Sequence, residues 1–514
     1  MVLMRKTLFT EVFKMSRNMR FALKIVAFLV LIVTVLNITN TVLCPKYFYN
    51  QDWPTTSTFA GFYDMEENSI DVLFFGSSHC VSAFSPQEIY ENYGLRSYNL
   101  ASEQQNMLVS YYWLKEALRF QTPKVVVVDT YFAFPFMGGS YALNSDEPTI
   151  RKAIDAMHWS RVKVDAVHDI CEYDSQQSKM SYYFKNIRFH TRWLGLNEED
   201  FTYPEMYAHT ELKGYSMLSN HGNNETYIPF EKGSSDSYLY MEPLMQLYLD
   251  KIVETCKENN IKLILVKTPT TDGIIERYNT TCEYALQNGI EYYDFNEKEL
   301  YDEISYDYAA DNQDDSHANL WGGKKISNYI AKLILEKYNV EPVEDKQWED
   351  CREFYAHAIK NAELKYVKNL NEYFSELLDD KYTVFIALQG DNTIISNDKV
   401  QQQLEHIGVS RKLLDQSQDS FYAVISENGV KEAASCEMLN YTESFREGRS
   451  NYSIISAGSG CGNIGSIVID GVEYSINQPG LNVVIYDNIY KKVIDSVCFN
   501  GFEGTRAEDL LSAM

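Results

Sequence analysis

The sequence predicts an α/β fold with a parallel sheet for the middle of the chain, one membrane-spanning helix before it and a mostly β domain after it. Three observations lead to this prediction. A long apolar stretch lies close to the N-terminus, short runs rich in Val, Ile and Leu alternate with amphipathic stretches in the middle, and short runs of alternating polarity follow. The chain of 514 residues is long enough for roughly two to four domains.

The apolar stretch comprises residues 21–43. As a helix these 23 residues extend about 34 Å, enough to cross a bilayer core of about 30 Å. Six basic residues precede it or lie at its start, against the single acid Glu11: Arg5, Lys6, Lys14, Arg17, Arg20 and Lys24. Because positive charge stays in the cytoplasm, we expect a cytoplasmic tail at 1–20 and a single-pass plasma-membrane protein with extracellular domains. No small-x-small cleavage pattern follows, which favours an uncleaved anchor.

Composition excludes some classes of function. Apolar residues make up 45% and charged residues 23% of the chain, as is typical of a folded protein. The 72 acidic and 46 basic residues give a net charge of −26, which argues against nucleic acid as a partner because phosphate contacts need Lys and Arg. The nine cysteines are scattered, without a CxxC motif or metal-ligand spacing. We therefore expect no metal, no other cofactor and few or no disulfides.

Residues 69–339 are predicted to form the α/β domain. Its expected strands are the apolar runs 70–76, 97–101, 124–129, 262–267 and 290–295. Amphipathic stretches with helical periodicity separate these runs, which indicates a parallel sheet with helices on both faces. The stretch 135–240 breaks the alternation and is rich in aromatic residues, His and Arg. It is predicted to be an insertion that forms a lid or a wall of the site.

The rest of the chain divides into two parts. Residues 340–380 are amphipathic and predict a helical connector. Residues 381–514 contain the short runs YTVFIAL, FYAVIS, SIVIDG and LNVVIYD, separated by Gly, Asn and Asp. This pattern is typical of strands, so a separate, mostly β domain is expected.

Two motifs at the ends of the predicted α/β domain suggest nucleophilic catalysis. The first strand ends in FFGSSHCVSAFSP, which places a serine hydroxyl at the carboxyl end of the sheet, where open α/β sheets bind ligands. Gly76 allows the tight turn that this requires. The second motif, DNQDDSHANLWGG, sets Asp314 and His317 three residues apart just before a helix. A carboxylate at that spacing can orient the imidazole, which in turn can take the proton of a serine hydroxyl.

Together the two motifs resemble the SGNH (GDSL-like) hydrolases, in particular the membrane-anchored members that modify cell-surface glycans. Relatives in that group include alginate O-acetylation proteins and the teichoic-acid D-alanyl transfer protein. The resemblance covers residues 69–339 and implies a flavodoxin-like, three-layer parallel sheet. It also implies that Ser78 is the nucleophile, that His317 is the general base and that Asp314 orients His317.

Two other blocks of the chain depart from the family pattern. The second block offers Ala101 and Ser102 where the family has a glycine N–H donor. The third block offers Asp129 and Thr130 in the region where the family has Gly-x-Asn. The resemblance therefore implies an oxyanion hole built from the N–H groups of Ser78 and Ser102.

Alternatives remain open around these residues. Ser77 becomes the nucleophile if the register of the first block shifts by one, and Asp315 can replace Asp314. Cys80 is expected to belong to the core. The candidate substrate contacts are His79, Asp129, Thr130, His190 and Arg192. His190 and Arg192, together with Trp193, are expected either to line a glycan groove or to form a local stacking cluster. Lys267 is expected either to contact substrate or to be a surface charge.

Residues from about 381 to 502 resemble the ILEI/PANDER-like domain through KYTVFIALQGDN, FYAVISENGV and GLNVVIYDNIYKKVIDSVCFN. This resemblance implies a compact β sandwich that binds sugar. A structural or protein-docking module is the alternative interpretation.

The resemblance implies acyl-ester chemistry on an extracellular cell-envelope polysaccharide, as an O-acyltransferase or an esterase. The expected partners are a cell-surface glycan and a membrane-bound protein that passes acyl groups across the bilayer. Two alternatives are a non-catalytic glycan-binding or scaffold protein with a degenerate SGNH fold, and a D-alanyl transfer protein for teichoic acid.

Overall fold

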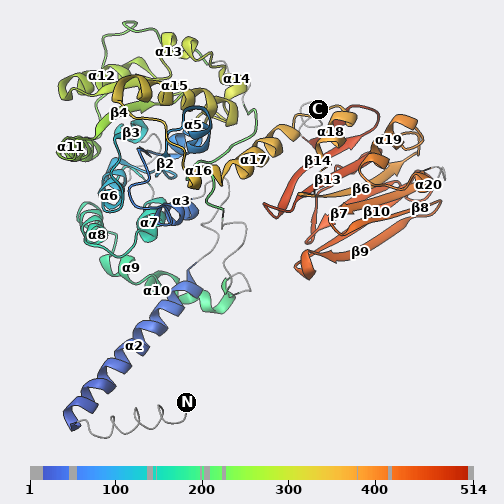
Figure 1. Cartoon of the computed structure of the whole chain (residues 1–514), viewed down its shortest axis with the longest axis horizontal. Coiled ribbons are helices and arrows are strands. Elements are labelled where there is room, and N and C mark those ends of the chain that lie inside the picture. The colour runs from blue at the N-terminus through green and yellow to red at the C-terminus, as the bar shows by residue number, and fades with distance from the viewer. Residues whose placement is uncertain are drawn as a thin grey trace. The chain divides into compact units, whose positions relative to one another are not determined.

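The computed structural model describes residues 16–44, 55–135, 143–145, 147–196, 200–201, 209–222, 227–378, 380–414 and 419–507. The chain divides into two compact units, Met1–Arg352 and Glu353–Met514 (Figure 1). The boundary between the units falls within the stretch 340–380, for which a helical connector is predicted.

A long apolar helix, α2 (Arg17–Leu43), occupies the predicted range near the N-terminus. It begins after Ser16, whose hydroxyl accepts a hydrogen bond from the Met19 N–H at 3.3 Å. The helix has 27 residues, and an 18-residue stretch of it has a mean hydropathy of 2.6. It is long and apolar enough to cross a membrane, and a signal sequence can have the same properties. Its side chains are exposed except near its C-terminal end.

Five parallel strands form the sheet of the first unit, in the order β2-β1-β3-β4-β5. They are β1 (Val72–Phe75), β2 (Ser97–Asn99), β3 (Val125–Asp129), β4 (Lys262–Lys267) and β5 (Glu291–Asp294). Each strand lies within one of the predicted apolar runs, and the predicted parallel pairing is confirmed. All residues of β1 and β3, which lie inside the sheet, are buried.

Helices surround this sheet and fill the intervals between its strands. They are α3 (Thr55–Tyr63), α4 (Ser78–Ala83), α5 (Pro86–Tyr93), α6 (Met107–Ala117), η1 (Tyr131–Ala133), α7 (Glu147–Ala156), α8 (Arg161–Tyr173), α9 (Lys179–Tyr183), α10 (Asn186–Phe189), η2 (His190–Gly195), α11 (Pro243–Glu258), α12 (Ile275–Asn288), α13 (Lys298–Glu303), α14 (Tyr308–Asp311), α15 (Leu320–Tyr338) and α16 (Lys346–Glu349). The 135–240 insertion contributes α7 to α10 and η2.

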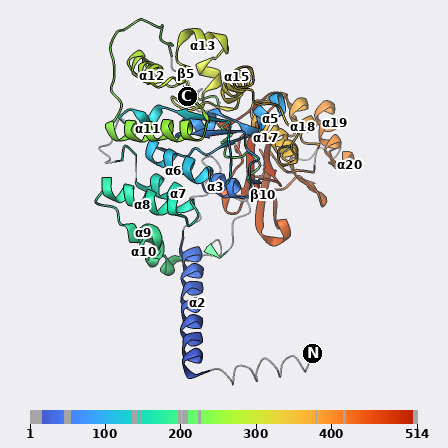
Figure 2. The same ribbon diagram turned by 60° about the vertical axis from the view of Figure 1, so that its left-hand side comes forward.

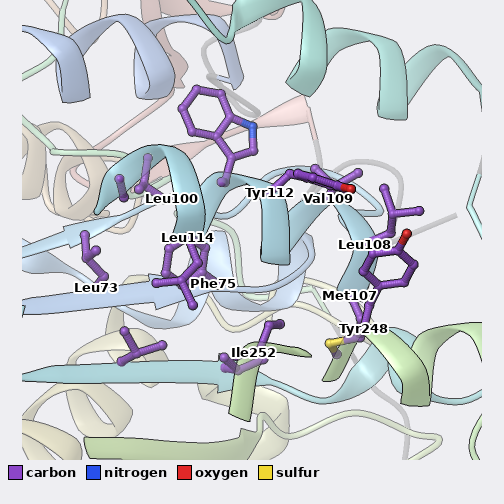
Figure 3. Close-up of a cluster of buried hydrophobic side chains, with 14 of the residues drawn as sticks. Leu73, Phe75, Leu100, Met107, Leu108, Val109, Tyr112, Leu114, Tyr248 and Ile252 are labelled. Atoms are coloured by element: carbon purple, nitrogen blue, oxygen red, sulfur yellow. The ribbon is translucent and has the colours of Figure 1, made fainter. Parts of the chain in front are cut away.

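The helices cover both faces of the sheet, because alternate residues of each strand point to opposite sides. On one face, Leu73 and Phe75 of β1 pack in a cluster with side chains of α6 and α11 (Figure 3). The same cluster includes buried side chains of α3, α7 and α8. On the other face, Val72 and Phe74 pack with side chains of α4, α5 and α15. The result is a three-layer arrangement with the carboxyl ends of all five strands along one edge.

The second unit is rich in β structure, as predicted. Its strands are β6 (Tyr382–Gly390), β7 (Ser420–Ser426), β8 (Gly429–Ser435), β9 (Leu439–Phe445), β10 (Ser450–Gly458), β11 (Ile464–Ile469), β12 (Val472–Glu473), β13 (Gly480–Asp487), β14 (Lys492–Phe499) and β15 (Gly504–Thr505). They form one sheet along β12-β11-β10-β6-β13-β14-β15, with β7 to β9 as branches. The described strands pair antiparallel, except that β6 and β10 are parallel.

Helices cover one side of the central strand β6. The helical elements of this unit are α17 (Arg352–Leu364), α18 (Leu370–Glu376), α19 (Asp398–His406), α20 (Arg411–Leu414) and η5 (Arg446–Gly448). Ile386 and Leu388 of β6 pack with side chains of α18 and α19, whereas Phe385 and Ala387 pack with strands β7, β10 and β11. α19 lies in the region for which a mostly β domain is predicted, and no helix is predicted at its position.

Candidate active site

Ser78 is the first residue of α4, directly after the turn that leaves β1. Gly76 makes this turn, and a Cβ added to it would lie only 2.7 Å from the Cβ of Asp129. Only glycine therefore fits between the end of β1 and the neighbouring strand β3. The turn places Ser78 at the carboxyl edge of the sheet, and its side chain is half-buried.

The loop between α14 and α15 brings Asp314 and His317 to Ser78. The Nε2 atom of His317 lies 2.9 Å from the Ser78 Oγ, so the hydroxyl can donate to the imidazole. On the other side of the ring, Nδ1 lies 2.9 Å from each carboxylate oxygen of Asp314. Asp314 also accepts hydrogen bonds from the N–H groups of Ser316, at 2.8 Å, and of His317, at 2.9 Å. The structure therefore aligns an alcohol, an imidazole and a carboxylate.

Two features of α15 hold this loop in place. Asn319 caps the helix, and its side-chain oxygen accepts from the N–H groups two and three residues later, at 3.0 and 3.2 Å. Gly323 packs against α4 so closely that an added Cβ would lie 2.9 Å from the Ser82 carbonyl oxygen. The helix that follows His317 thus contacts the helix that begins with Ser78.

The ionisation of Asp314 suits an orienting acid. Burial raises the pKa of this carboxyl group. The hydrogen bond and the charge of His317, together with the N–H groups of Ser316 and His317, lower it by more, so the pKa lies below its usual range. Asp314 is therefore a carboxylate at neutral pH and keeps a proton on Nδ1 of His317, so that Nε2 can accept the Ser78 proton. The side chains of His317 and Asp314 are 18% and 42% exposed, so solvent reaches the site.

The two predicted oxyanion donors differ in their partners. Among the described residues, none accepts a hydrogen bond from the Ser78 N–H, so this group is available to an oxyanion. The Ser102 N–H instead donates to the Gly76 carbonyl oxygen at 3.3 Å. The Ser102 hydroxyl donates to Gln105 at 2.9 Å. The structure thus brings Ser102 to the turn before Ser78 but leaves its N–H engaged.

His79 lies beside the aligned residues. Its ring packs on Tyr131, with centroids 4.0 Å apart, and edge-on to His317 at 5.0 Å. Burial, together with the charges of Lys267, His317 and Arg277, lowers the pKa of His79 well below its usual value. The imidazole is therefore neutral, and its buried Nδ1 has no hydrogen-bond partner among the described residues.

Asp129 and Thr130, at the end of β3, face the neighbouring strand and turn. The Thr130 N–H and hydroxyl both donate to the Val266 carbonyl oxygen, at 2.9 and 3.1 Å. Asp129 accepts from the N–H groups of Tyr131, at 3.0 Å, and Thr268, at 3.4 Å. Both side chains are buried, and burial raises the pKa of Asp129. Their described contacts stabilise the edge of the sheet next to Gly76.

Residues that follow β3 and β4 complete the surroundings of His79. Lys267 is buried rather than a surface charge, and its Nζ lies 5.0 Å from the centre of the Tyr131 ring. Arg277 lies 5.9 Å from the same ring and pairs with Asp272 at 2.7 Å. Tyr131, Asp272 and Arg277 are not among the site residues predicted from the sequence. The rule that ligands bind at the carboxyl ends of parallel strands could have indicated them, since they follow strand ends.

His190 and Arg192 lie elsewhere in the first unit. An Arg192 Nη donates to the Leu43 carbonyl oxygen of α2 at 2.7 Å, and the other pairs with Asp200 at 2.6 Å. His190 Nδ1 lies 3.0 Å from the Ile187 carbonyl oxygen. Both residues belong to η2, which lies beside α2 and at the opposite end of the first unit from α14 and α15 (Figures 1 and 2). The structure therefore does not bring them to Ser78.

The alternatives to Ser78 and Asp314 occupy other positions. The Ser77 side chain caps α4 by accepting from the His79 N–H at 3.4 Å, and it is almost fully buried. The carboxylate of Asp315 accepts from the Ser316 hydroxyl at 3.1 Å. Cys80 is part of the buried core, and burial raises its pKa well above the usual value.

Part of the 135–240 insertion borders the site. The N–H of Ser216 donates to Val81 in α4 at 3.0 Å, and Leu218 accepts from the first residue of α15 at 2.8 Å. Further along, the Gly222 N–H donates to the Asn312 carbonyl oxygen at 3.2 Å. Residues 209–222 thus line both helices that carry the site.

The comparisons with known proteins find similarity among solved structures only. No family model and no curated protein matches the chain. Among solved structures, the chain is similar to a GDSL-like lipase from Bacteroides thetaiotaomicron, with 12% sequence identity and a TM-score of 0.26. The match covers 55% of this chain and 98% of the lipase chain. The functional assignment therefore rests on the chain's own residues.

Proposed function

We propose that the chain is a serine acyl-ester enzyme of the SGNH type, an O-acyltransferase or esterase that acts on an extracellular cell-envelope polysaccharide. The observation that carries the proposal is the 2.9 Å distance between Ser78 Oγ and His317 Nε2, with Asp314 on Nδ1. A hydroxyl in this position loses its proton to the imidazole as it attacks an ester carbonyl.

The reaction proceeds in two steps. Ser78 Oγ bonds to the carbonyl carbon while its proton moves to His317 Nε2, and the Ser78 N–H donates to the developing oxyanion. Collapse of the tetrahedral species breaks the ester bond, and the leaving alcohol takes the proton from His317. Water or a sugar hydroxyl then attacks the acyl-enzyme, gives its proton to His317, and releases Ser78, which recovers that proton.

The topology of the first unit supports the SGNH assignment. The strand order β2-β1-β3-β4-β5 is that of flavodoxin-like sheets, whose ligands bind beyond the carboxyl ends of the strands. Ser78 follows β1 directly at that edge. The same edge carries Tyr131 after β3 and the residues that follow β4, so a substrate at Ser78 would meet several elements.

The location and partners belong to the same proposal. α2 is proposed to anchor the protein in the plasma membrane, with the tail before it in the cytoplasm and both units outside, because basic residues precede the helix. A membrane-bound acyl-transfer protein would supply acyl groups there. The second unit, as an ILEI/PANDER-like domain, would hold the glycan.

Hydrolysis of p-nitrophenyl acetate tests the enzymatic proposal. The purified full-length chain in detergent should release p-nitrophenol, and Ser78→Ala should lower kcat/KM by about 10³-fold or more. A sugar acceptor that increases p-nitrophenol release and becomes acetylated would identify a transferase, whereas release that does not depend on acceptor would identify an esterase. Equal rates for wild type and Ser78→Ala would refute the proposed nucleophile.

One observation favours a second candidate, a non-catalytic glycan-binding or scaffold protein. The Ser102 N–H is engaged by Gly76, and the third block carries Asp129 where the family has Gly-x-Asn, so the oxyanion hole has one free donor of the two proposed. A scaffold would bind polysaccharide but release no p-nitrophenol. A D-alanyl transfer protein for teichoic acid would instead require a D-alanyl ester as substrate.

A further inference from the structure

The C-terminal end of α2 makes specific contacts with the 135–240 insertion. The Asn186 N–H donates to Asn40 Oδ1 and the Asn186 side chain to Thr39 Oγ1, both at 3.0 Å. Arg192 donates to the Leu43 carbonyl oxygen at 2.7 Å. These contacts leave the last turns of α2 half-buried, whereas the preceding part of the helix is exposed. α10 and η2 therefore lie directly against the end of the membrane helix (Figure 2).

The segment that makes these contacts exposes large apolar side chains. We call residues 179–195, which comprise α9, α10 and η2, the juxtamembrane segment. Its exposed apolar residues, with exposed fractions, are Met180 (52%), Phe184 (39%), Ile187 (50%), Trp193 (66%) and Leu194 (74%). Five exposed apolar residues thus lie within one short segment, whereas a soluble surface normally exposes such residues singly. We call these five residues the apolar patch.

The length of α2 sets the depth of this patch. The apolar stretch from Phe21 to Leu43 extends about 34 Å as a helix, slightly more than a bilayer core of about 30 Å. Residues at its end therefore lie at the level of the lipid headgroups when the helix crosses. Arg192 contacts that end directly, so the neighbouring Trp193 lies at the depth where Trp is enriched in membrane proteins.

We infer that the juxtamembrane segment lies in the lipid interface and that its apolar residues insert into the outer leaflet of the bilayer that α2 crosses. The inference rests on the proposed membrane anchor, not on the proposed catalysis. Interfacial contact by short helices requires an apolar face and an aromatic anchor at headgroup depth, and this segment supplies both. The occupant of the patch is thus lipid, and the first unit has two attachments to the membrane.

Apolar insertion rather than charge holds this contact. Arg188 pairs with Asp155 at 2.5 Å and Arg192 with Asp200 at 2.6 Å, so two of the four basic residues of the segment are already neutralised. High salt, which screens exposed charges, should therefore leave the contact intact. Two attachments would also fix the orientation of the first unit, in which α15 lies at the end away from α2 (Figures 1 and 2).

Quenching of tryptophan emission by brominated lipid tests the inference. The full-length chain is reconstituted in liposomes of phosphatidylethanolamine and phosphatidylglycerol, with or without phosphatidylcholine brominated on its acyl chains. Trp193→Phe should remove the largest share of the quenched emission, at low and at high salt alike. Trp321→Phe, at the start of α15, should leave the quenched share unchanged. Trp193 is 66% exposed, so its replacement by Phe leaves the fold intact.

Each other outcome overturns the inference. Quenching that Trp193→Phe leaves unchanged, in protein that resists alkaline carbonate extraction, would mean that α2 is inserted but that the juxtamembrane segment does not enter the lipid. Release by carbonate would refute the anchor and, with it, the lipid contact. Hydrolysis of a soluble ester by the same preparation in detergent reports on catalysis separately, so the two proposals fail independently.

Discussion

Asp314 contributes to the site in two ways, and both follow from its position in the turn before α15. Its carboxylate contacts the imidazole of His317 and also accepts two backbone N–H groups of the same turn. The backbone contacts keep the carboxylate in place even when the ring moves. A single side chain thus fixes the loop, the tautomer and the orientation of His317.

Asp314→Asn should lower kcat for p-nitrophenyl acetate by about 10³- to 10⁴-fold, because an amide no longer holds the required tautomer of His317. Asp315→Asn is the matched control, since the Asp315 carboxylate contacts Ser316. Its kcat should stay close to that of the wild type. A larger loss for Asp315→Asn than for Asp314→Asn would reverse the assignment of the orienting acid.

The pH dependence of the same residue follows from its lowered pKa. The folded-state pKa of Asp314 lies below the ordinary aspartate value of about 3.9. Above that value the carboxylate is fully ionised, so its contribution to kcat is complete. The contribution is lost as the pH falls through the folded pKa. The kcat of the wild type measured from pH 8 downwards should therefore show no loss from Asp314 until the pH is below about 4.

Among helices and strands, the sequence predicted the sheet of the first unit well and the insertion poorly. The strands β1, β3 and β4 are near-continuous apolar runs because both faces of the sheet are covered, and such runs are easy to recognise. His190 and Arg192 looked like site residues because aromatic and basic residues surround them. Their true neighbour, α2, lies about 150 positions away, and no local pattern shows such a contact.

The helix α19 was not predicted, although its signal is local. Asn397 caps it, and it buries Val400 and Leu404, four residues apart, against the sheet. Only one turn of apolar spacing is present between strands that are strongly β-like, so the local signal was weak.

At the site, the spacing of Asp314 and His317 indicated an interaction within one loop, but only the packing of α15 on α4 brings His317 to Ser78.

Gly323→Ala tests that packing. An added Cβ would lie 2.9 Å from the Ser82 carbonyl oxygen, so α15 must shift from α4 and move His317 from Ser78. A displacement of about 1 Å costs about 10²-fold in rate, and kcat/KM for p-nitrophenyl acetate should fall by that order. Gly460→Ala, where nothing lies within 4 Å of the added Cβ, should leave the rate unchanged. An unaltered rate for Gly323→Ala would contradict the role of the close helix contact.

In the second unit, Asp487 links β13 to α17. Its buried carboxylate contacts His357 Nε2 at 2.8 Å and the Asn361 side chain. Burial raises the pKa of Asp487, but these contacts and the Tyr490 N–H lower it overall. Asp487→Ala should lower the opening free energy of β13 by about 3 kcal/mol, because it leaves the buried His357 unpaired. Native-state hydrogen exchange of β13 amides measures this change.

A control and a pH series complete that measurement. Asp398→Ala is the control, because it removes an exposed ion pair with Arg411. It should change the opening free energy of β13 by about 0.5 kcal/mol or less. The contribution of Asp487 to the opening free energy of β13 should be present above about pH 4. It should be lost as the pH falls further, because the folded-state pKa of Asp487 lies below the ordinary value. Equal effects of the two substitutions would contradict a stabilising role for Asp487.

For the chain as a whole, the proposed topology places every element after α2 outside the cell. Cys436 is exposed, whereas the other cysteines are buried or half-buried. A membrane-impermeant maleimide should therefore label Cys436 in intact cells, and Cys436→Ser should abolish that labelling. Labelling that appears only after lysis would show that the second unit lies in the cytoplasm.

The proposed chemistry requires that one hydroxyl among many be activated. A fluorophosphonate probe reacts with a serine only where a base takes its proton, and it forms a stable bond to Oγ. The full-length wild-type chain should be labelled, Ser82→Ala on the same helix should be labelled equally, and Ser78→Ala should not be labelled at all. A wild-type chain that stays unlabelled, or a Ser78→Ala chain that is labelled like the wild type, would contradict catalysis by Ser78, His317 and Asp314.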